Sequence, residues 1–525
     1  MKMSRGEFLK LGLVAGAGLV LPLGTSACSF RSNEGSTGNL LRSQARLPQP
    51  FQVPLPMPPV LEPVRSNADV DYYEMTQKIG QADILNGVKT EVWGYEGIFP
   101  GPTIESRSGR RIVVRQINEL PVPVSTHLHG GRTPPESDGF PTDLILPEGY
   151  PSPASHGHFG EARWSLHEGS REYSYPLEQR ASTLWYHDHR MDFTGPQVWR
   201  GLAGFHIVRD DEEDALPLPK GEKDVPLMIC DRSFDEDGSF LYPSLDPSLT
   251  EHHGVEQDYM QGVLGDVILV NGAPWPYMEV SNTKHRFRIL NASNARRYEL
   301  ALDPEPQEDV APFIQIGSDG GLLDAPLSHR TIPIASAERF DVVIDFSRYP
   351  VGTTVKLGNR IGDGTTADIM QFRVVREEKE ESAVPQTLSD MDDFEALDEG
   401  GAMRERKFRF SRVGEDGEVM WGVNGEVFDP ERIDARPELG STEVWRFITD
   451  VHHPVHLHLV HFKVLSRSGR EPLPKDAGWK DTVDVPPGQV VRLLARFDGY
   501  RGKYVFHCHN LEHEDMMMMA NFEVV

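Results

Sequence analysis

The stretch Val270-Asn-Gly272-Ala-Pro-Trp-Pro decides the fold class, because it is a turn between apolar strands that recurs along the chain. Two other stretches share its character: Gly94-Tyr-Glu-Gly97-Ile-Phe-Pro and Gly422-Val-Asn-Gly425-Glu-Val-Phe. A similar strand follows each turn, namely Arg111-Ile-Val-Val-Arg-Gln-Ile-Asn118, Arg286-Phe-Arg-Ile-Leu-Asn291 and Glu443-Val-Trp-Arg-Phe-Ile448. Three copies of one β unit are the simplest explanation.

Length and composition agree with a chain of several β domains. At about 150 residues per domain, 525 residues predict three or four units. The 48 glycines and 41 prolines are scattered along the chain, which suits many short strands joined by turns better than long helices. We therefore expect an all-β protein.

The sequence divides into units at changes of composition. Residues 31–63 are polar and then proline-rich, which predicts an extended linker packed on the surface. Residues 376–406 are dominated by Glu and Asp, which predicts a solvated linker with, at most, a short helix. We expect folded domains over 64–212, 213–375 and 407–525.

The formal net charge is -27. Such a chain repels phosphate backbones and anionic lipid surfaces, so nucleic acids and membranes are poor partners, whereas cations and neutral small molecules remain plausible.

Residues 1–30 have the layout of an export signal. Lys2, Arg5 and Lys10 precede an apolar run over 11–24, and small residues follow it. The run is too short to span a bilayer as a stable anchor. The stretch around Arg5 resembles a twin-arginine signal, with Gly6 where the second arginine belongs. We expect an exported protein, periplasmic, in the cell envelope or extracellular, by a route that the sequence leaves open.

The chain has three cysteines. Cys28 ends the signal, where it is either removed with the signal or lipidated. Cys230 and Cys508 could form a disulfide, but the histidines around Cys508 favour a metal ligand. Cys230 is then expected as a small apolar residue buried in a strand.

Ten of the twenty histidines fall into four tight groups. They are His127-x-His129, His187-x-His189, His453-x-x-His456-x-His458, and His507-Cys508-His509 with His513. One such pair means little, because surface or core histidines often match it by chance. Four groups that share a cysteine indicate metal sites.

Strand geometry sorts these side chains into two sites. Residues two apart on a strand share a face, and residues one or three apart lie on opposite faces. His507 and His509 therefore lie on one side of their strand and Cys508 on the other. In the same way His453 points away from His456 and His458.

The side with Cys508 and His453 also gains His513 and Met518. Two imidazoles, a thiolate and a weak axial thioether are the ligands of a blue copper electron-transfer site. The other side collects eight imidazoles, too many for one ion and about right for three. Because Cys508 is bonded through the chain to His507 and His509, an electron has a short path between the two sites.

The four groups match, in order and spacing, the copper signatures of the multicopper oxidases. The resemblance extends through Phe99-Pro-Gly-Pro-Thr103, Gly265-Asp-Val-Ile-Leu-Val-Asn-Gly272, Ile316-Gly-Ser-Asp-Gly-Gly321 and Gly478-Trp-Lys-Asp-Thr482, and it covers about residues 45–525. It is greatest to the spore-coat laccase and bilirubin oxidase branch. It implies three cupredoxin-like Greek-key β-barrel domains and four copper ions, with the trinuclear site between the first and third domains.

The resemblance also implies a role for each ligand. His453, Cys508, His513 and Met518 would bind the type 1 copper, and His127 and His456 the type 2 copper. The type 3 pair would be bound by His129, His187, His189, His458, His507 and His509. Met518 is chosen by spacing alone, because Met516, Met517, Met518 and Met519 run together.

Reduction of dioxygen to water consumes protons, so acids are expected near the cluster. Asp138 and Glu514 lie where the family places such groups. A turn-forming Asp138 and a solvated Glu514 are the alternative interpretation. We predict a catalytic role for both, since acids beside metal ligands often support them.

Other histidines are not recruited as ligands. His156 and His158 lie in a Pro-, Ser- and Gly-rich stretch without a partner group and are interpreted as a loop insert. His461 is too far from His453 along an extended strand to share an ion. The remaining ungrouped histidines are His452, His252, His253 and His329.

The resemblance implies a laccase-like oxidase that couples one-electron oxidation of phenols, aromatic amines or bilirubin-like substrates to reduction of dioxygen. We expect a monomer whose partners are dioxygen and a small aromatic or metal-ion reductant. A cuprous-ion oxidase is an alternative, although the scattered methionines do not form the expected methionine-rich insert. A non-catalytic copper-binding envelope protein is another, but it would not need Cys508 to bridge two sites. Zinc has no use for an axial methionine.

Overall fold

The computed structural model describes residues 37–150, 164–306, 310–414 and 420–525. The predicted export signal and the pair His156 and His158 lie outside these residues. The described chain from residue 37 onward belongs to one compact unit. Its elements are overwhelmingly strands, so the all-β prediction is confirmed.

The three predicted turns have the same backbone conformation. Both central residues have positive φ in each: Glu96 (58°) and Gly97 (66°), Asn271 (49°) and Gly272 (82°), Asn424 (57°) and Gly425 (85°). Two consecutive residues with positive φ are typical of type I′ turns, whose twist matches that of the flanking strands. The repeat seen in the sequence is therefore a repeat of backbone geometry.

Strand pairing repeats in the same way. In each copy one strand pairs antiparallel with the strand before the turn and parallel with the similar strand further along the chain. These triplets are β3 (Val70–Ala82) with β4 (Thr90–Tyr95) and β6 (Arg111–Asn118), β13 (Asp224–Phe234) with β16 (Val267–Val270) and β19 (Lys284–Asn291), and β27 (Arg404–Val413) with β28 (Met420–Val423) and β29 (Ser441–Thr449). The prediction of three copies of one unit is confirmed.

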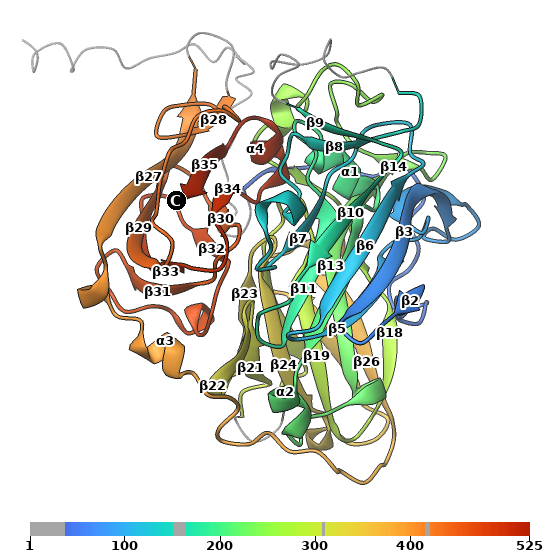
Figure 1. Ribbon diagram of the computed structural model, residues 1–525. Helices are drawn as coiled ribbons and strands as arrows, with labels where there is room; N and C mark the ends of the chain where they lie inside the picture. The colour runs from blue at the N-terminus through green and yellow to red at the C-terminus, as the bar shows by residue number, and fades with distance from the viewer. Residues whose placement is uncertain (1–36, 151–163, 307–309, 415–419) are drawn as a thin grey trace, which may run out of the picture. The chain divides into compact units, whose positions relative to one another are not determined.

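The strands around these triplets form three successive pairs of sheets (Figure 1). The first pair comprises β2 (Arg65–Ser66), β3, β4, β6 and β10 (Ser170–Tyr175), opposite β5 (Gly101–Arg107), β7 (Thr126–His129), β11 (Ser182–Asp188) and β12 (Ala203–Arg209). We call it the first domain.

The second pair of sheets, the second domain, has the longest sheet. This longest sheet comprises β13, β14 (Phe240–Leu241), β16, β17 (Ala273–Pro274), β19, β21 (Phe313–Ser318), β22 (Gly321–His329) and β24 (Arg339–Asp345). Its other sheet comprises β18 (Tyr277–Ser281), β20 (Tyr298–Asp303), β23 (Ile332–Ile334), β25 (Thr354–Asn359) and β26 (Asp368–Arg376). Cys230 lies on β13 and is fully buried, as predicted.

The third pair of sheets, the third domain, is drawn in orange and red in Figure 1. One sheet comprises β27, β28, β29, β31 (Phe462–Arg467) and β33 (Val490–Phe497). The other comprises β30 (His453–Leu457), β32 (Thr482–Val485), β34 (Gly502–Cys508) and β35 (Met519–Val524). Apolar side chains from both sheets form its core, which includes Cys508 and Met518.

Few helices occur in the described residues, and all are short: α1 (Thr194–Arg200), α2 (Asp211–Ala215), α3 (Asp392–Ala396) and α4 (Leu511–Asp515). Two further strand pairs are β1 (Asn39–Leu40) with β15 (Val263–Leu264), and β8 (Asp143–Leu146) with β9 (Ser165–Glu168). None of the helices in the described part of the chain is long and apolar enough to cross a membrane.

The proline-rich segment is extended, as predicted, and it joins two domains. The backbone N–H of Phe51 donates to the carbonyl of Trp275 at 2.8 Å, and that of Leu61 donates to Thr103 at 2.8 Å. Proline suits such an edge position because it has no N–H to leave unpaired. The segment therefore packs along both the second and the first domain.

The acidic segment 376–406 is not solvated throughout, contrary to the sequence-based interpretation. It contains the expected short helix, α3, but Leu388, Met391 and Leu397 are buried. Leu397 packs with Val444 and Leu494 of the third domain. A few apolar residues among many acids are enough to dock the segment.

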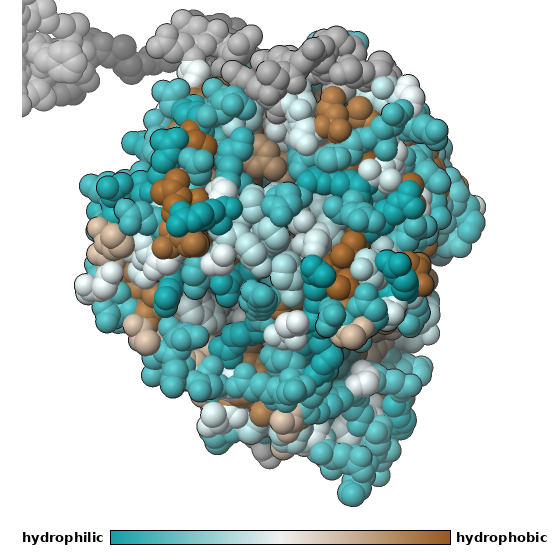
Figure 2. Space-filling model, in the orientation of Figure 1, coloured by the Kyte–Doolittle hydropathy of each residue, from teal (hydrophilic) through white to brown (hydrophobic). Residues whose placement is uncertain are grey.

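The face drawn in Figure 2 is largely hydrophilic, with apolar side chains in small separate patches. Such a surface agrees with the high net negative charge of the sequence.

Candidate metal centres

Paired neighbouring strands present the histidine groups. On β7 and β11, His127 lies directly opposite His187. On β30 and β34, His456 lies opposite His507, and Val455 lies opposite Cys508. Strand alternation turns Cys508 away from the histidines on either side of it, as the sequence predicts. The ladder hydrogen bonds thus fix the backbone of two separate sites.

The first site contains the cysteine. Nδ1 of His453 lies 3.2 Å from Sγ of Cys508, Nδ1 of His513 lies 3.6 Å from the same sulfur, and the two Nδ1 atoms are 3.0 Å apart. All three side chains are fully buried. Burial raises the pKa of the Cys508 thiol well above its usual value, so the thiolate forms only when a bound cation displaces the proton.

The methionine run divides between two parts of the core. Met516 and Met518 pack in the same apolar cluster as Cys508, whereas Met517 and Met519 pack in another with Phe140. The backbone N–H of Cys508 donates to the carbonyl of Met518 at 3.1 Å. Met516 approaches the second domain instead, since a methyl group added to Gly254 would lie 3.8 Å from its sulfur.

The second site contains the other eight histidines, all at most 1% exposed. Their ring nitrogens form three groups in which the potential ligand atoms lie within 4.8 Å of one another: His127, His456 and His458; His129, His187 and His509; and His189, His458 and His507. The site is built by the first and third domains. The predicted division of the histidines from Cys508 is present in the structure.

The free ring nitrogens of these histidines fit metal ions. Nε2 of His127, His187 and His456, Nδ1 of His129 and both nitrogens of His509 are buried without a hydrogen-bond partner. Nε2 of His507 lies 3.2 Å from Nε2 of His189 and 3.2 Å from Nε2 of His458. Buried polar atoms are normally paired, so this concentration of unpaired nitrogens indicates a site for cations.

Several histidines of the second site are also held in the neutral form that a metal requires. Burial lowers the pKa of His187 to about 3 and that of His189 to about 4. Burial likewise lowers the pKa of His127, His129 and His509 well below the usual value. Neutral imidazoles can bind a cation without first losing a proton.

Asp138 touches two of the predicted ligands. Nδ1 of His458 donates to its carboxylate at 2.7 Å, and Nδ1 of His127 donates to its backbone carbonyl at 2.6 Å. The side chain is 1% exposed, and burial raises its pKa to about 8. A role in forming a turn does not account for the side chain of Asp138, because its carboxyl group faces the histidine cluster.

Glu514 lies beside two other histidines of the same cluster. Its Oε2 is 3.1 Å from Nδ1 of His507, and its Oε1 is 3.7 Å from Nε2 of His189. Burial opposes its ionisation, but the two imidazoles have the larger effect and lower its pKa to about 2. Glu514 is not a solvated carboxylate, since it is 1% exposed.

Four further side chains contact the predicted ligands, and spacing did not single them out. Asp481 accepts from Nε2 of His129 at 3.1 Å, and Asp450 lies 3.0 Å from Nε2 of His453. The indole rings of Trp421 and Trp185 have centroids 3.9 Å from His513 and 4.2 Å from His187. Of these four contacts, the one made by Trp185 could have been expected from the sequence, because Trp185 lies two residues before His187.

The unrecruited histidines stay outside the ligand groups of the described residues. His452 lies 3.4 Å from Asp484, and His461 lies 3.8 Å from Asp481. His329 bonds to Gln315 at 2.8 Å. His252 and His253 also lie outside the ligand groups found in the described part of the chain.

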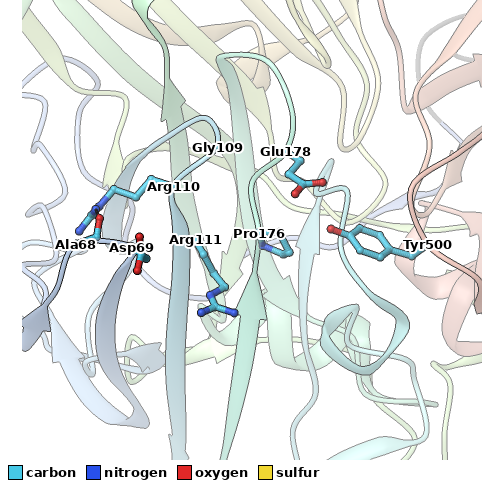
Figure 3. Close-up of a pocket in the computed structure, with 8 residues that line it drawn as sticks. All are labelled: Ala68, Asp69, Gly109, Arg110, Arg111, Pro176, Glu178 and Tyr500. Carbon is cyan, nitrogen blue, oxygen red and sulfur yellow. Dashed lines mark hydrogen bonds between the residues drawn. The ribbon is translucent and has the colours of Figure 1, made fainter.

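Two surface depressions formed by described residues contain none of the predicted ligands. One of about 540 Å³ is lined by Asp69, Arg110, Glu178 and Tyr500, among others (Figure 3). The guanidinium of Arg110 is already paired with Asp71. None of the predicted ligands lines this depression, so it is not the candidate site.

A buried cysteine and histidine centre, joined by one tripeptide to a histidine cluster on a fold of paired β-sheets, defines a copper-binding electron-transfer protein. Comparison with known proteins agrees. Residues 76–153, 161–213 and 401–525 match family models described as multicopper oxidase. The chain is 38% identical to the laccase of Bacillus stratosphericus over 90% of this chain and 98% of that protein.

Two other comparisons extend the match. The chain is 34% identical to the bilirubin oxidase of Albifimbria verrucaria, over 93% of this chain and 84% of that protein. The crystal structure of a laccase from Pediococcus acidilactici superimposes with a TM-score of 0.77, at 32% identity, over 92% of this chain and 96% of that one.

The chain therefore belongs to the multicopper oxidase family, and its domains are cupredoxin-like. Within the family it is a laccase-like and bilirubin oxidase-like oxidoreductase that uses oxygen as the electron acceptor.

Proposed function

We propose that the chain binds four copper ions and couples one-electron oxidation of a small aromatic reductant to four-electron reduction of dioxygen to water. The observation that carries this proposal is the placement of His507-Cys508-His509: the thiol lies in the first site, and both flanking imidazoles lie in the second, each in a different histidine group. One tripeptide thereby links the site that accepts an electron to the site that uses it.

We assign the ligands as follows. His453, Cys508, His513 and Met518 bind the type 1 copper, His127 and His456 the type 2 copper, and His129, His187, His189, His458, His507 and His509 the type 3 pair. The buried unpaired ring nitrogens and the three histidine groups support this assignment. The burial of Met518 in the same cluster as Cys508, and the position of the Met516 side chain near Gly254, support Met518 as the residue that would supply the thioether ligand.

Bound at these residues, copper supplies one-electron acceptance at the type 1 site and dioxygen reduction at the trinuclear site. The residues of the chain supply the path for the electron and the acid groups for proton transfer. Covalent bonds from Cys508 to His507 and His509 carry the electron. Asp138, whose pKa is raised by burial, bonds to His458, and Glu514 lies 3.1 Å from Nδ1 of His507, so two acid groups border the cluster and could transfer protons.

We propose phenols, aromatic amines or bilirubin-like molecules as reductants, in line with the names of the relatives. Such a molecule would approach the imidazole edges of His453 and His513. Asp450 is partly exposed and lies 3.0 Å from Nε2 of His453, so a molecule bound at the surface beside Asp450 would be one side chain away from this imidazole. A short outer-sphere contact is enough for one-electron transfer.

We also propose that residues 1–30 direct export and are removed, and that the mature protein is a monomer. Export through a twin-arginine-like route would allow folding and copper loading before transport. N-terminal sequencing of the secreted protein tests the first statement, and light scattering tests the second.

The decisive experiment is copper stoichiometry with an absorption spectrum of the copper-loaded protein. Cys508→Ser is the test variant, and Cys230→Ser is the matched control because Cys230 is equally buried but far from the ligand groups. We expect about four coppers and an intense blue band, lost only in Cys508→Ser. One copper per chain, or zinc instead, contradicts the proposal.

A further inference from the structure

We propose that Arg339 of the second domain is a positioning residue for the trinuclear copper site. Acting through Asp481, it holds His129 and His456 in the orientation and tautomer that copper binding needs. The inference rests on the ligand assignment proposed above. It gives the second domain, which supplies none of those ligands, a part in building the site.

Arg339 and Asp481 form a two-pronged ion pair. Nη1 of Arg339 donates to Oδ1 of Asp481 at 2.7 Å, and Nη2 donates to Oδ2. Both side chains are 1% exposed. The paired contact fixes the rotation of the carboxylate as well as its position, which a single point charge would not do.

The guanidinium is itself fixed from two domains. Its Nε donates to the carbonyl of Thr183 in the first domain at 3.0 Å, and Nη1 donates to Ala337 at 2.9 Å. Gly130 leaves room for the pair, because an added methyl group would lie 2.8 Å from Nη2 of Arg339 and 2.9 Å from Oδ2 of Asp481. Arg339 therefore has one available arrangement.

Asp481 in turn fixes the orientation of two histidines. Its Oδ1 accepts from Nε2 of His129 at 3.1 Å, and its backbone carbonyl accepts from Nδ1 of His456 at 2.9 Å. The protons on these nitrogens leave Nδ1 of His129 and Nε2 of His456 with free lone pairs, and these are the nitrogens that lack a partner in the chain. A partner on one ring nitrogen sets which nitrogen can bind metal.

The two histidines belong to different copper ions in our assignment. Their rings are stacked, with centroids 3.7 Å apart and an angle of 16° between planes. A change in the orientation of Asp481 would therefore disturb a type 2 and a type 3 ligand together. It would leave Cys508, His453 and His513 unaffected, because Asp481 contacts none of them.

Neighbouring buried charges hold the pair in place. Oδ1 of Asp319 accepts from the backbone N–H of Arg339 at 2.8 Å, and its Oδ2 accepts from that of Asp481 at 3.2 Å. Nζ of Lys480 lies 2.9 Å from Asp319. A purely structural role, joining three domains, is the competing explanation, and it predicts a loss of stability without a selective effect on copper.

Arg339→Met and Arg339→Lys, compared with Arg286→Met, separate these explanations. Arg286 is an equally buried arginine of the same sheet, with a two-pronged contact to Asp341 and none to the ligands. We expect Arg339→Met to keep the blue band of the type 1 site. Its type 2 copper, followed by its electron paramagnetic resonance signal in competition with a chelator, should bind about 10–100-fold more weakly.

Arg339→Lys should give an intermediate loss, and Arg286→Met should lower the unfolding temperature but leave copper content and signal unchanged. Wild-type type 2 signal and affinity in Arg339→Met overturn the inference. If that variant does not fold, the same result in Arg339→Lys overturns it. Absence of a blue band or of four coppers in the wild type would instead contradict the proposed function.

Discussion

The carboxylate of Asp138 accepts a hydrogen bond of 2.7 Å from Nδ1 of His458, although 320 residues separate them in the chain. The contact joins the first domain to the third at the histidine cluster. Its position also gives the cluster an acid that is shielded from water, since Asp138 is 1% exposed.

Replacing Asp138 by Asn should lower the rate of dioxygen reduction about 100-fold, because the amide keeps the shape but cannot supply a proton. Burial raises the pKa of Asp138 to about 8, so the wild-type carboxyl is protonated at neutral pH, and the rate should fall as the pH rises toward that value. The positive charge of bound copper would shift this fall in rate to lower pH. Steady-state rates across pH at saturating reductant measure both effects.

Asp231→Asn is the control for this prediction. Asp231 is equally buried, but it pairs with Arg296 and lies away from the cluster. The control should change stability and leave the pH profile alone. An Asp138→Asn protein with full copper and the wild-type pH profile would contradict a proton-transfer role.

Spacing predicted that Cys508 and its two neighbouring histidines face different sites, because strand alternation is a local rule. His507, Cys508 and His509 need only an extended backbone to face two sides, and β34 provides it. The three turns were recognisable for the same reason, since the conformation of Asn271 and Gly272 depends on those two residues.

Contacts between distant segments could not be predicted in this way. No local rule places Arg339 against Asp481, or Leu397 against Val444. Spacing selected Met518 from the methionine run, but spacing does not show how each methionine packs. Only packing shows that Met516 approaches Gly254.

Replacing Met518 by Leu should keep the blue band and raise the reduction potential of the proposed type 1 copper, because a thioether ligand would stabilise the oxidised ion. Leucine has a similar volume, so the core around Cys508 should stay packed. Redox titration of the blue band measures the potential. Met516→Leu is the matched control and should have the wild-type potential; a shift in that variant alone would move the axial role to Met516.

Replacing Glu512 by Gln should lower stability and disturb the type 1 site, because Glu512 anchors α4 to the second domain. Its carboxylate accepts from Tyr242 at 2.9 Å, Asn294 at 2.9 Å and the backbone of Val263 at 3.0 Å. An amide would turn its N–H groups toward these donors, at a cost of about 1–3 kcal/mol.

Thermal unfolding and the position of the blue band measure the effect of Glu512→Gln, since His513 is the next residue. The exposed Glu438 is a suitable control, and Glu438→Gln should change neither quantity. An unchanged unfolding temperature in Glu512→Gln would show that α4 is held by its apolar contacts alone.

The stability of the protein should fall in acid because of a buried ion-pair cluster between the first and second domains. Glu213 on α2 lies 2.8 Å from Arg288 and 3.0 Å from Arg286. Asp224 lies 2.9 Å from Arg288. Burial alone would raise the pKa values of both carboxyl groups, but the guanidinium groups have the larger effect and lower them.

A carboxyl group whose pKa is lower in the folded state stabilises the fold at every pH above its unfolded pKa, which is about 4 for Asp and Glu. That contribution is lost progressively as the pH falls from about 5 toward the folded pKa. The unfolding temperature should therefore be steady near neutral pH and drop steeply below about pH 5.

Glu213→Gln should lose about 3–5 kcal/mol at neutral pH, because it leaves buried guanidinium groups without a full partner. The same variant should show a shallower decline in unfolding temperature between about pH 5 and pH 3, since one contributing group has been removed. Glu74→Gln is the control, because the Glu74 to Arg115 pair is about half exposed and such pairs contribute about 0–1 kcal/mol. Equal acid sensitivity in the wild type and Glu213→Gln would place the acid-labile groups elsewhere in the chain.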